Sequence, residues 1–256
     1  FYLPQFHRVA ENDAWWGTGF TEWTSAGRAM PRFEGHYQPR IPRDLGHYTL
    51  EGTATMRAQV ALARGAGLAG FVHYFYWFNG RRLLEGPVEA MLGDPGVDFP
   101  FCLMWANENW TRAWDGGDDQ VLMRQDYAPE DDAALVDCLA RHFRDGRYIR
   151  WEGRPVLMVY RPARIPDARA AVARWRALFM ERHGEAPWFV MAQSFEAMDP
   201  RDFGFDMAVE FPPHKLVGGL ALRNAGLTYY DPGATAQVYG YDDVVAASLG
   251  EAVPDY

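Results

Sequence analysis

Apolar runs of strand length alternate along the chain with segments whose apolar residues recur at helical spacing. Six runs look like strands: residues 2–6, 70–78, 99–105, 155–160, 188–193 and 207–211. Helical spacing is found in residues 53–65, 87–92, 129–144, 167–183 and, in a shorter form, 242–249. Near-continuous apolar strands are typical of a parallel sheet covered by helices. The pattern therefore predicts an α/β protein made of repeated strand–helix units.

Two architectures fit such repeats, a doubly wound open sheet and a (β/α)8 barrel of the TIM type. A dinucleotide-binding open sheet carries a Gly-rich loop after its first strand, whereas the first run here continues into Gln5, Phe6 and His7. We therefore predict a (β/α)8 TIM barrel that forms a single domain over residues 1–256. About six of its eight units are identifiable, so we expect the barrel to be incomplete at the C-terminus. The sequence does not begin with Met, so the expectation of an incomplete barrel extends to the N-terminus.

The strongest chemical signal follows the third apolar run, where residues 105–110 read Trp-Ala-Asn-Glu-Asn-Trp. Barrel enzymes take their active-site residues from the carboxyl ends of strands. Indole rings can pack on the face of a sugar while carboxamides and a carboxylate bind its hydroxyls. We predict that Glu108 is catalytic, because glycosidases act through carboxyl groups. The alternative is a buried glutamate paired with an arginine such as Arg112 for structural reasons.

A second candidate catalytic carboxylate, Glu210, ends the sixth apolar run. Pro212 and Pro213 follow it and restrict the backbone before His214. The alternative is a glutamate that accepts hydrogen bonds from loop amides below the pocket. The sequence favours the catalytic and the structural role of Glu210 about equally.

Other polar and aromatic residues lie at strand ends or in the long segment 8–48, which is too aromatic for a disordered linker and is expected to form a lid or wall. Tyr160 and Arg161 end the fourth run. Asp115 fits a plain turn slightly better than sugar binding. The predicted substrate-binding residues are Gln5, His7, Trp15, Trp16, Glu22, Trp23, His73, Tyr74, Tyr76, Trp77, Trp105, Asn107, Trp110, Arg112 and His214.

Composition and charge narrow the classes of partner. Aromatic residues make up 15% of the chain, and the formal net charge is −9. A negative surface argues against nucleic acid as a partner. No run approaches the ~20 apolar residues of a membrane-spanning helix. Neither a metal-binding His or Cys motif nor a GxSxG nucleophile motif occurs, so we expect no metal, no other cofactor and no serine nucleophile.

Taken together, the motifs resemble the glycoside hydrolase family 99-like proteins, which are often labelled WbsX-type glycosyltransferases. The resemblance implies a (β/α)8 barrel that acts on glycans and is related to endo-α-mannosidases. It also implies two catalytic carboxylates in a late Asn-Glu-Trp-x-Glu-Gly motif, which this sequence lacks, since Glu251 is the only glutamate after Pro213. Glu108 would then orient the sugar. The matching pieces are residues 1–7, 11–17, 19–23, 73–78, 105–110 and 210–214.

Three functions remain open, and all involve an oligosaccharide or polysaccharide partner. The first is a glycoside hydrolase acting on cell-surface or extracellular polysaccharide. The second is a glycosyltransferase of lipopolysaccharide O-antigen synthesis, although the sequence shows no Gly-rich turn, basic cluster or acidic pair for a sugar diphosphate. The third is a non-catalytic carbohydrate-binding remnant. The sequence allows a location in the cytoplasm or at the cell envelope of a bacterium.

Overall fold

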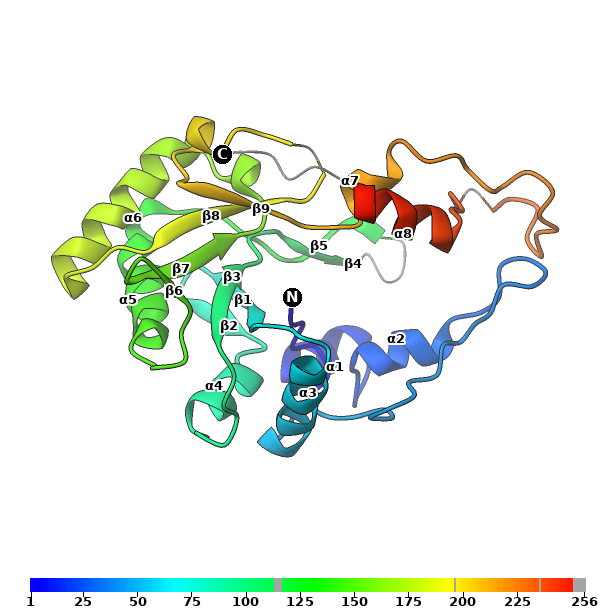
Figure 1. Ribbon diagram of the computed structural model, residues 1–256, viewed down its shortest axis with the longest axis horizontal. Helices are drawn as coiled ribbons and strands as arrows, with labels where there is room; N and C mark the ends of the chain where they lie inside the picture. The colour runs from blue at the N-terminus through cyan, green and yellow to red at the C-terminus, as the bar shows by residue number, and fades with distance from the viewer. Residues whose placement is uncertain (113–116, 196, 235, 251–256) are drawn as a thin grey trace.

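The computed structural model describes residues 1–112, 117–195, 197–234 and 236–250. Helices and strands alternate through most of this range (Figure 1). The helices are α1 Ala10–Trp16, α2 Glu22–Arg28, α3 Thr53–Gly65, α4 Gly86–Leu92, α5 Asp132–Phe143, α6 Ala168–His183, α7 His214–Val217 and α8 Tyr241–Gly250. The strands are β1 Phe71–Phe78, β2 Arg81–Leu83, β3 Phe101–Trp105, β4 Trp110–Arg112, β5 Gly117–Met123, β6 Arg150–Trp151, β7 Arg154–Val159, β8 Trp188–Gln193 and β9 Met207–Glu210.

The central sheet is mostly parallel, as the apolar runs predict. Strands β1, β3, β7, β8 and β9 pair in that order and all run parallel to their neighbours. Strand β2 pairs antiparallel with β1, and strand β6 pairs antiparallel with β7. Strands β4 and β5 form a separate hairpin. The described residues show no strand that pairs β9 with the opposite edge of the sheet, so barrel closure and the number of units stay predictions.

The prediction of a first strand over residues 2–6 is wrong except at one residue. Only Tyr2 pairs with the sheet, through a parallel bridge to His73 of β1. Pro4 has no amide hydrogen to donate to a neighbouring strand. The carbonyls that follow are used elsewhere, because Gln5 O accepts from Glu22 N at 3.1 Å and Phe6 O accepts from Leu50 N at 2.9 Å. The segment therefore ties the long N-terminal region to the sheet.

The two faces of the sheet have different neighbours because alternate side chains point to opposite sides. On one face, Phe75, Leu103 and Phe189 belong to the main core together with residues of α3, α5 and α6. Figure 1 shows α3, α4, α5 and α6 arranged around the outside of the sheet. On the other face, Met104 and Ala192 pack with Tyr74, Tyr160 and other partly buried residues. This second face leads to the polar residues at the carboxyl ends of the strands.

Four of the expected helices form close to their predicted bounds. The pattern at residues 129–144 divides into a 3-10 turn, Pro129–Asp131, and α5. Short 3-10 turns also occupy Pro162–Arg164 and Pro200–Phe203. The long segment 8–48 contains α1 and α2, which the apolar pattern does not indicate. Helix α2 begins after Thr21, whose side chain forms a capping box with Thr24.

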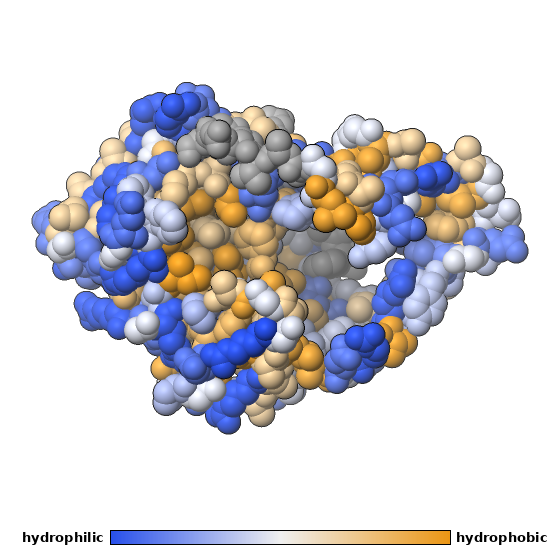
Figure 2. Space-filling model, viewed as in Figure 1, coloured by the Kyte–Doolittle hydropathy of each residue, from blue (hydrophilic) through white to orange (hydrophobic). Residues whose placement is uncertain are grey.

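The N-terminal segment and the segment before α8 meet beyond the carboxyl ends of the strands. Phe33 forms an antiparallel bridge with Tyr229, and Glu34 N donates to Thr228 O at 2.9 Å. Figure 2 shows an opening between the part of the molecule that carries α2 and the part that carries α8. The bridge therefore links two parts of the chain that lie on opposite sides of this opening.

Candidate functional site

Asn107 fixes the backbone where β3 ends. Its buried side chain acts as an extra rung between β3 and β7, since Arg161 N donates to Asn107 Oδ1 at 2.8 Å and Asn107 Nδ2 donates to Arg161 O at 2.9 Å. Asn107 Nδ2 also donates to the Tyr127 hydroxyl at 3.0 Å, and that hydroxyl donates to Asn107 O. The sequence predicts Asn107 as a sugar ligand, but its hydrogen-bonding groups are thus used within the protein. Asn107 positions the next residue, Glu108.

Glu108 pairs with a residue at the end of the neighbouring strand. Arg161 Nη1 donates to Glu108 Oε1 at 2.8 Å. The Glu108 side chain keeps 38% of its surface exposed. It lines a cavity of about 300 Å³ with Trp16, Phe20 and Trp110, and the other lining residues are Gln5, Asn12, Asn109 and Thr111. A carboxylate held beside a cation therefore faces a cavity with aromatic walls.

Four tyrosines respond to the charge of Glu108. Burial raises the pKa of Tyr74, Tyr76, Tyr127 and Tyr160, and in each case the negative charge of Glu108 raises it further. For Tyr127 the pKa reaches about 12. The phenols therefore stay protonated at neutral pH.

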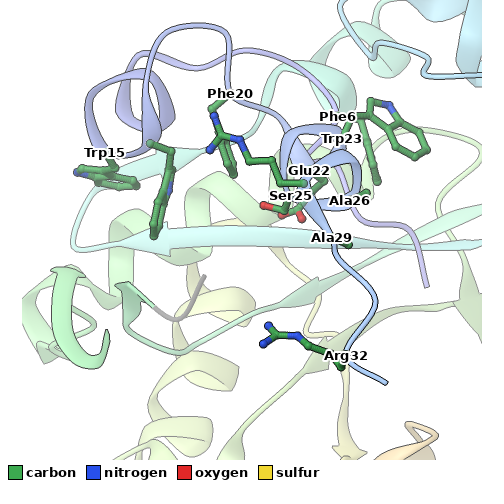
Figure 3. Close-up of a pocket in the computed structure, with 11 residues that line it drawn as sticks. Phe6, Trp15, Phe20, Glu22, Trp23, Ser25, Ala26, Ala29 and Arg32 are labelled. Carbon is green, nitrogen blue, oxygen red and sulfur yellow. The ribbon is translucent and has the colours of Figure 1, made fainter. Parts of the chain in front are cut away.

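A larger cavity, of about 710 Å³, adjoins the first one. The two share Trp16 and Phe20 as lining residues. Residues 15–32, with Phe6, form the wall of the larger cavity, and Figure 3 shows Trp15, Phe20, Glu22 and Arg32 among them. This agrees with the expectation that the N-terminal segment forms a wall beside the site. The remaining lining residues are Trp23, Ser25, Ala26, Arg28 and Ala29.

Glu22 is the carboxyl group of the larger cavity. Burial raises its pKa to about 7. Its Oε1 atom is buried and has no hydrogen-bond partner among the described residues. The Glu22 carboxyl group therefore holds a proton more readily than an exposed glutamate does, whereas Glu108 lies beside the guanidinium of Arg161.

A short chain of contacts runs from the backbone of Glu22 to Tyr76 and on to Trp110. Glu22 N donates to Gln5 O, and Gln5 Nε2 donates to the Tyr76 hydroxyl at 2.9 Å. The charges of Glu22 and Glu108 both contribute to the raised pKa of Tyr76. The Tyr76 ring in turn lies edge-on to Trp110, with 5.4 Å between centroids. Tyr76 therefore stands near both carboxyl groups.

Most of the predicted aromatic residues gather at these cavities. Trp15 contacts Trp110 edge-on at 5.6 Å, and Arg112 Cζ lies 5.4 Å from the centroid of the Trp16 ring. Trp23 lines the larger cavity while its indole nitrogen donates to Tyr48 O at 2.7 Å. The two cavities thus bring together Gln5, Trp15, Trp16, Glu22, Trp23 and Trp110, and Arg112 lies over the ring of Trp16.

Glu210 lies elsewhere on the same edge of the sheet. It pairs with Gln193 in the β8–β9 register, and Lys215 Nζ donates to its Oε1 atom at 2.7 Å. Strands β3 and β9 are three strand spacings apart, roughly 14 Å along the sheet. His214 stacks on Phe195 with 4.7 Å between ring centroids. The structure therefore gives Glu210 its own cation and does not place it in the cavities of Glu108 and Glu22.

Four predicted binding residues lie away from both cavities. His73 is completely buried against Tyr2 and Phe101 on the helix-covered face, and burial lowers its pKa to about 3. Trp77 and Trp105 are on the same face; Trp77 Nε1 donates to Asp131. His7 is buried, and its Nδ1 atom lies 2.7 Å from Pro4 O. His73, Trp77 and Trp105 pack in the interior because alternation along β1 and β3 turns every second residue away from the site.

Several residues at or near the site are absent from the predicted substrate-binding residues. Tyr160 and Arg161, which the sequence places at the end of the fourth run, follow β7 directly, and Arg161 pairs with Glu108. Phe20 and Arg28 belong to the long N-terminal segment and carry no periodic signal. Their selection would have required knowing that this segment folds back over the carboxyl ends of the strands.

Neither a metal-binding cluster nor a membrane-spanning helix occurs among the described residues. The part of the chain that the structure describes contains no group of three or more His, Cys, Asp or Glu side chains suited to a metal ion. None of its helices combines the length and apolar character needed to cross a membrane. Asp115, the candidate turn or sugar-binding residue, lies outside the described residues.

The comparison with protein families covers nearly the whole chain. The model described as Glycosyltransferase WbsX matches residues 1–255. The chain belongs to the WbsX glycosyltransferase family. This confirms the resemblance inferred from the motifs, from the first residues to the segment around Glu210.

Two curated relatives of this WbsX family member come from Xanthomonas campestris pv. campestris, strains B100 and ATCC 33913. Both are described as uncharacterized protein WxcX and are 49% identical over 214 residues. The alignment covers 84% of this chain and 31% of each relative. The chain thus spans about a third of the length of the curated relatives that it matches.

Two solved structures of the GH99 endo-α-mannosidase from Bacteroides thetaiotaomicron are also similar to this WbsX family member. One, in complex with bis-tris propane, has a TM-score of 0.45 over 67% of this chain and 50% of its own. The other has a TM-score of 0.48 over 81% of this chain and 59% of its own. Sequence identity is 13% in both cases.

Proposed function

We propose that the chain forms the glycan-binding and reaction centre of a glycoside hydrolase that acts on cell-surface or extracellular polysaccharide. One observation carries this proposal: two carboxyl groups, one inclined to hold a proton and one beside a cation, line adjoining aromatic cavities. Glycoside hydrolysis needs a carboxyl group that can donate a proton and another that stays ionised. Glu22 and Glu108 match these two requirements.

The shape of the cavities suits a carbohydrate chain. Cavities of about 300 and 710 Å³ that share a wall can hold successive sugar units. Trp16 and Phe20 at the shared wall offer faces for the C–H surfaces of sugar rings. Gln5, Asn109 and Thr111 supply donors and acceptors for hydroxyl groups.

The roles of the carboxyl groups follow from their surroundings. Glu22 gives its proton to the glycosidic oxygen as the bond from that oxygen to the anomeric carbon breaks. The negative charge of Glu108 stabilises the positive charge that develops on the sugar ring. Water then adds its hydroxyl group to the anomeric carbon and returns a proton to Glu22, which completes the balance of the reaction. Glu210, the second carboxylate that the sequence suggests, remains the alternative partner of Glu108.

A transferase of lipopolysaccharide O-antigen synthesis is the second candidate, and the description of the matched family favours it. A transferase would place an activated sugar in the same cavities and pass it to a hydroxyl group instead of to water. Glu22 would then accept the proton of the acceptor hydroxyl group instead of donating one. The third candidate, a carbohydrate-binding domain without catalysis, needs the aromatic walls but neither carboxyl role.

The experiment that separates the three functions follows the fate of two substrates with the intact protein. One arm measures new reducing ends in bacterial surface polysaccharides, and the other measures release of nucleoside diphosphate from nucleotide sugars. We expect reducing ends to appear without consumption of nucleotide sugars. Consumption of nucleotide sugars with uncut polysaccharide would replace the hydrolase by the transferase. Sugar binding without either reaction would leave only the binding domain.

A further inference from the structure

Two arginines on the wall of the larger cavity have no ion-pair partner among the described residues. Arg28 and Arg32 both line this cavity, and both side chains are exposed. Most arginines elsewhere among the described residues are paired with a carboxylate, as Arg182 is with Asp137 and Arg201 with Asp199. In a chain of net charge −9, unmatched positive charge at the candidate site requires a separate explanation.

The carboxyl group in the same cavity does not neutralise this charge. Burial is the sole cause of the raised pKa of Glu22, so no arginine lies close enough to hold its charged form. A third cation stands at the wall between the two cavities, since Arg112 lies over the Trp16 ring. Arg28 and Arg32 therefore offer guanidinium donors to a ligand at the wall of the larger cavity.

Both arginines are attached to ordered backbone. Arg28 belongs to the last turn of α2. Tyr230 N donates to Arg32 O at 3.0 Å, next to the bridge between Phe33 and Tyr229. Figure 3 shows Arg32 across the cavity from Glu22, Ser25 and Ala26. A guanidinium held at its base loses less freedom when it binds a ligand than one on a loose segment.

We infer that the ligand of the larger cavity carries a negatively charged group that Arg28 and Arg32 bind. This inference rests on the proposed function and adds a substrate class to it. Guanidinium groups match the planar oxygens of carboxylates and the oxygens of phosphates. Two sources supply such a group, an acidic sugar in the polysaccharide or the diphosphate of an activated sugar. The latter would provide the basic cluster that a transferase needs and that the sequence does not reveal.

The test measures the dissociation constants of three ligands by titration calorimetry with the intact protein. The ligands are a uronic acid oligosaccharide, its carboxyl-reduced neutral counterpart, and UDP-glucose. The variant is Arg28→Gln combined with Arg32→Gln. The matched control is Arg201→Gln, which removes an exposed arginine far along the chain at the turn before β9. Thermal unfolding of each variant reports that it is folded.

We expect the acidic oligosaccharide to bind at least about tenfold more tightly than the neutral one, because hydrogen bonds to charged groups are the stronger kind. The double variant should lose this preference and the control should keep it. UDP-glucose that binds in place of the acidic oligosaccharide, with the same loss in the double variant, would also support the inference and identify a diphosphate.

Two results would overturn the inference. Equal binding of the acidic and neutral oligosaccharides, together with UDP-glucose binding that ignores the two arginines, would refute it and leave the proposed function standing. Absence of binding for all three ligands in the folded wild-type protein would remove both proposals.

Discussion

Arg161 Nη1 lies 2.8 Å from Glu108 Oε1, and this ion pair joins the carboxyl ends of β7 and β3. The guanidinium is itself held in place, because its Cζ atom stands 4.4 Å from the centroid of the Phe195 ring. The pair is partly exposed, so its contribution to folding stability is modest. Its main consequence is positional: it holds one carboxylate at the wall of a cavity.

We predict that Asn107→Ala destabilises the protein by about 2–3 kcal/mol, because it leaves buried hydrogen-bonding groups of Arg161 and Tyr127 without partners. Chemical denaturation measures the loss. The control is Gln237→Ala, which removes one exposed hydrogen bond from the Tyr239 hydroxyl and should cost less than about 1 kcal/mol. Equal losses in the two variants would show that Asn107 does not join β3 to β7.

Glu22→Gln should change how stability depends on pH. The pKa of Glu22 is about 7 in the folded protein and 4.5 for the free side chain, so the folded state binds the proton more tightly. The tighter proton binding by Glu22 therefore contributes fully to the free energy of unfolding below pH 4.5, and this contribution is lost as the pH rises through 7. The loss amounts to at most about 3 kcal/mol. Compared with wild type, Glu22→Gln should be less sensitive to pH between these values.

Denaturation midpoints at a series of pH values would follow this difference. Glu181 is exposed and has no ion pair among the residues that the structure describes, so it provides the control: Glu181→Gln should leave the pH profile as it is in wild type. Parallel profiles for wild type and Glu22→Gln would mean that Glu22 ionises normally, and its role as proton donor would then be lost.

His73→Phe should leave folding stability within about 1 kcal/mol of wild type, because neither ring nitrogen of His73 has a hydrogen-bond partner among the described residues. The His73 side chain contacts aromatic rings from Tyr2 and Phe101. Carbohydrate binding should also be unchanged. A variant that folds normally but binds sugar much more weakly would return His73 to the site, where the sequence places it.

The strands and most helices could be predicted because burial leaves a clear trace in the sequence. The runs that become β3, β7 and β8 are apolar on both faces, which only a covered sheet requires. The run at residues 2–6 has the same composition, yet Pro4 and the loop partners of Gln5 and Phe6 prevent pairing. Helices α1 and α2 are short and half-exposed, so they carry little periodic signal.

The site could be predicted only in part, because strand-end position does not reveal the direction of a side chain. Glu108 faces a cavity, but Trp105, three residues earlier, packs against Trp175 among the helices. Asn107 looks like a sugar ligand and is instead used up by Arg161 and Tyr127. Arg28 and Arg32 acquire their role only when the N-terminal segment folds beside the strands.

The most direct test of the account is the turnover number of the intact protein for polysaccharide cleavage, compared between wild type and Glu108→Gln, with Glu181→Gln as the control. Removal of the negative charge at the centre of the site should lower turnover by roughly a hundredfold or more, while the folding midpoint changes little. The control should cleave at the wild-type rate. Near-normal turnover in Glu108→Gln would contradict the account and place the reaction outside this cavity.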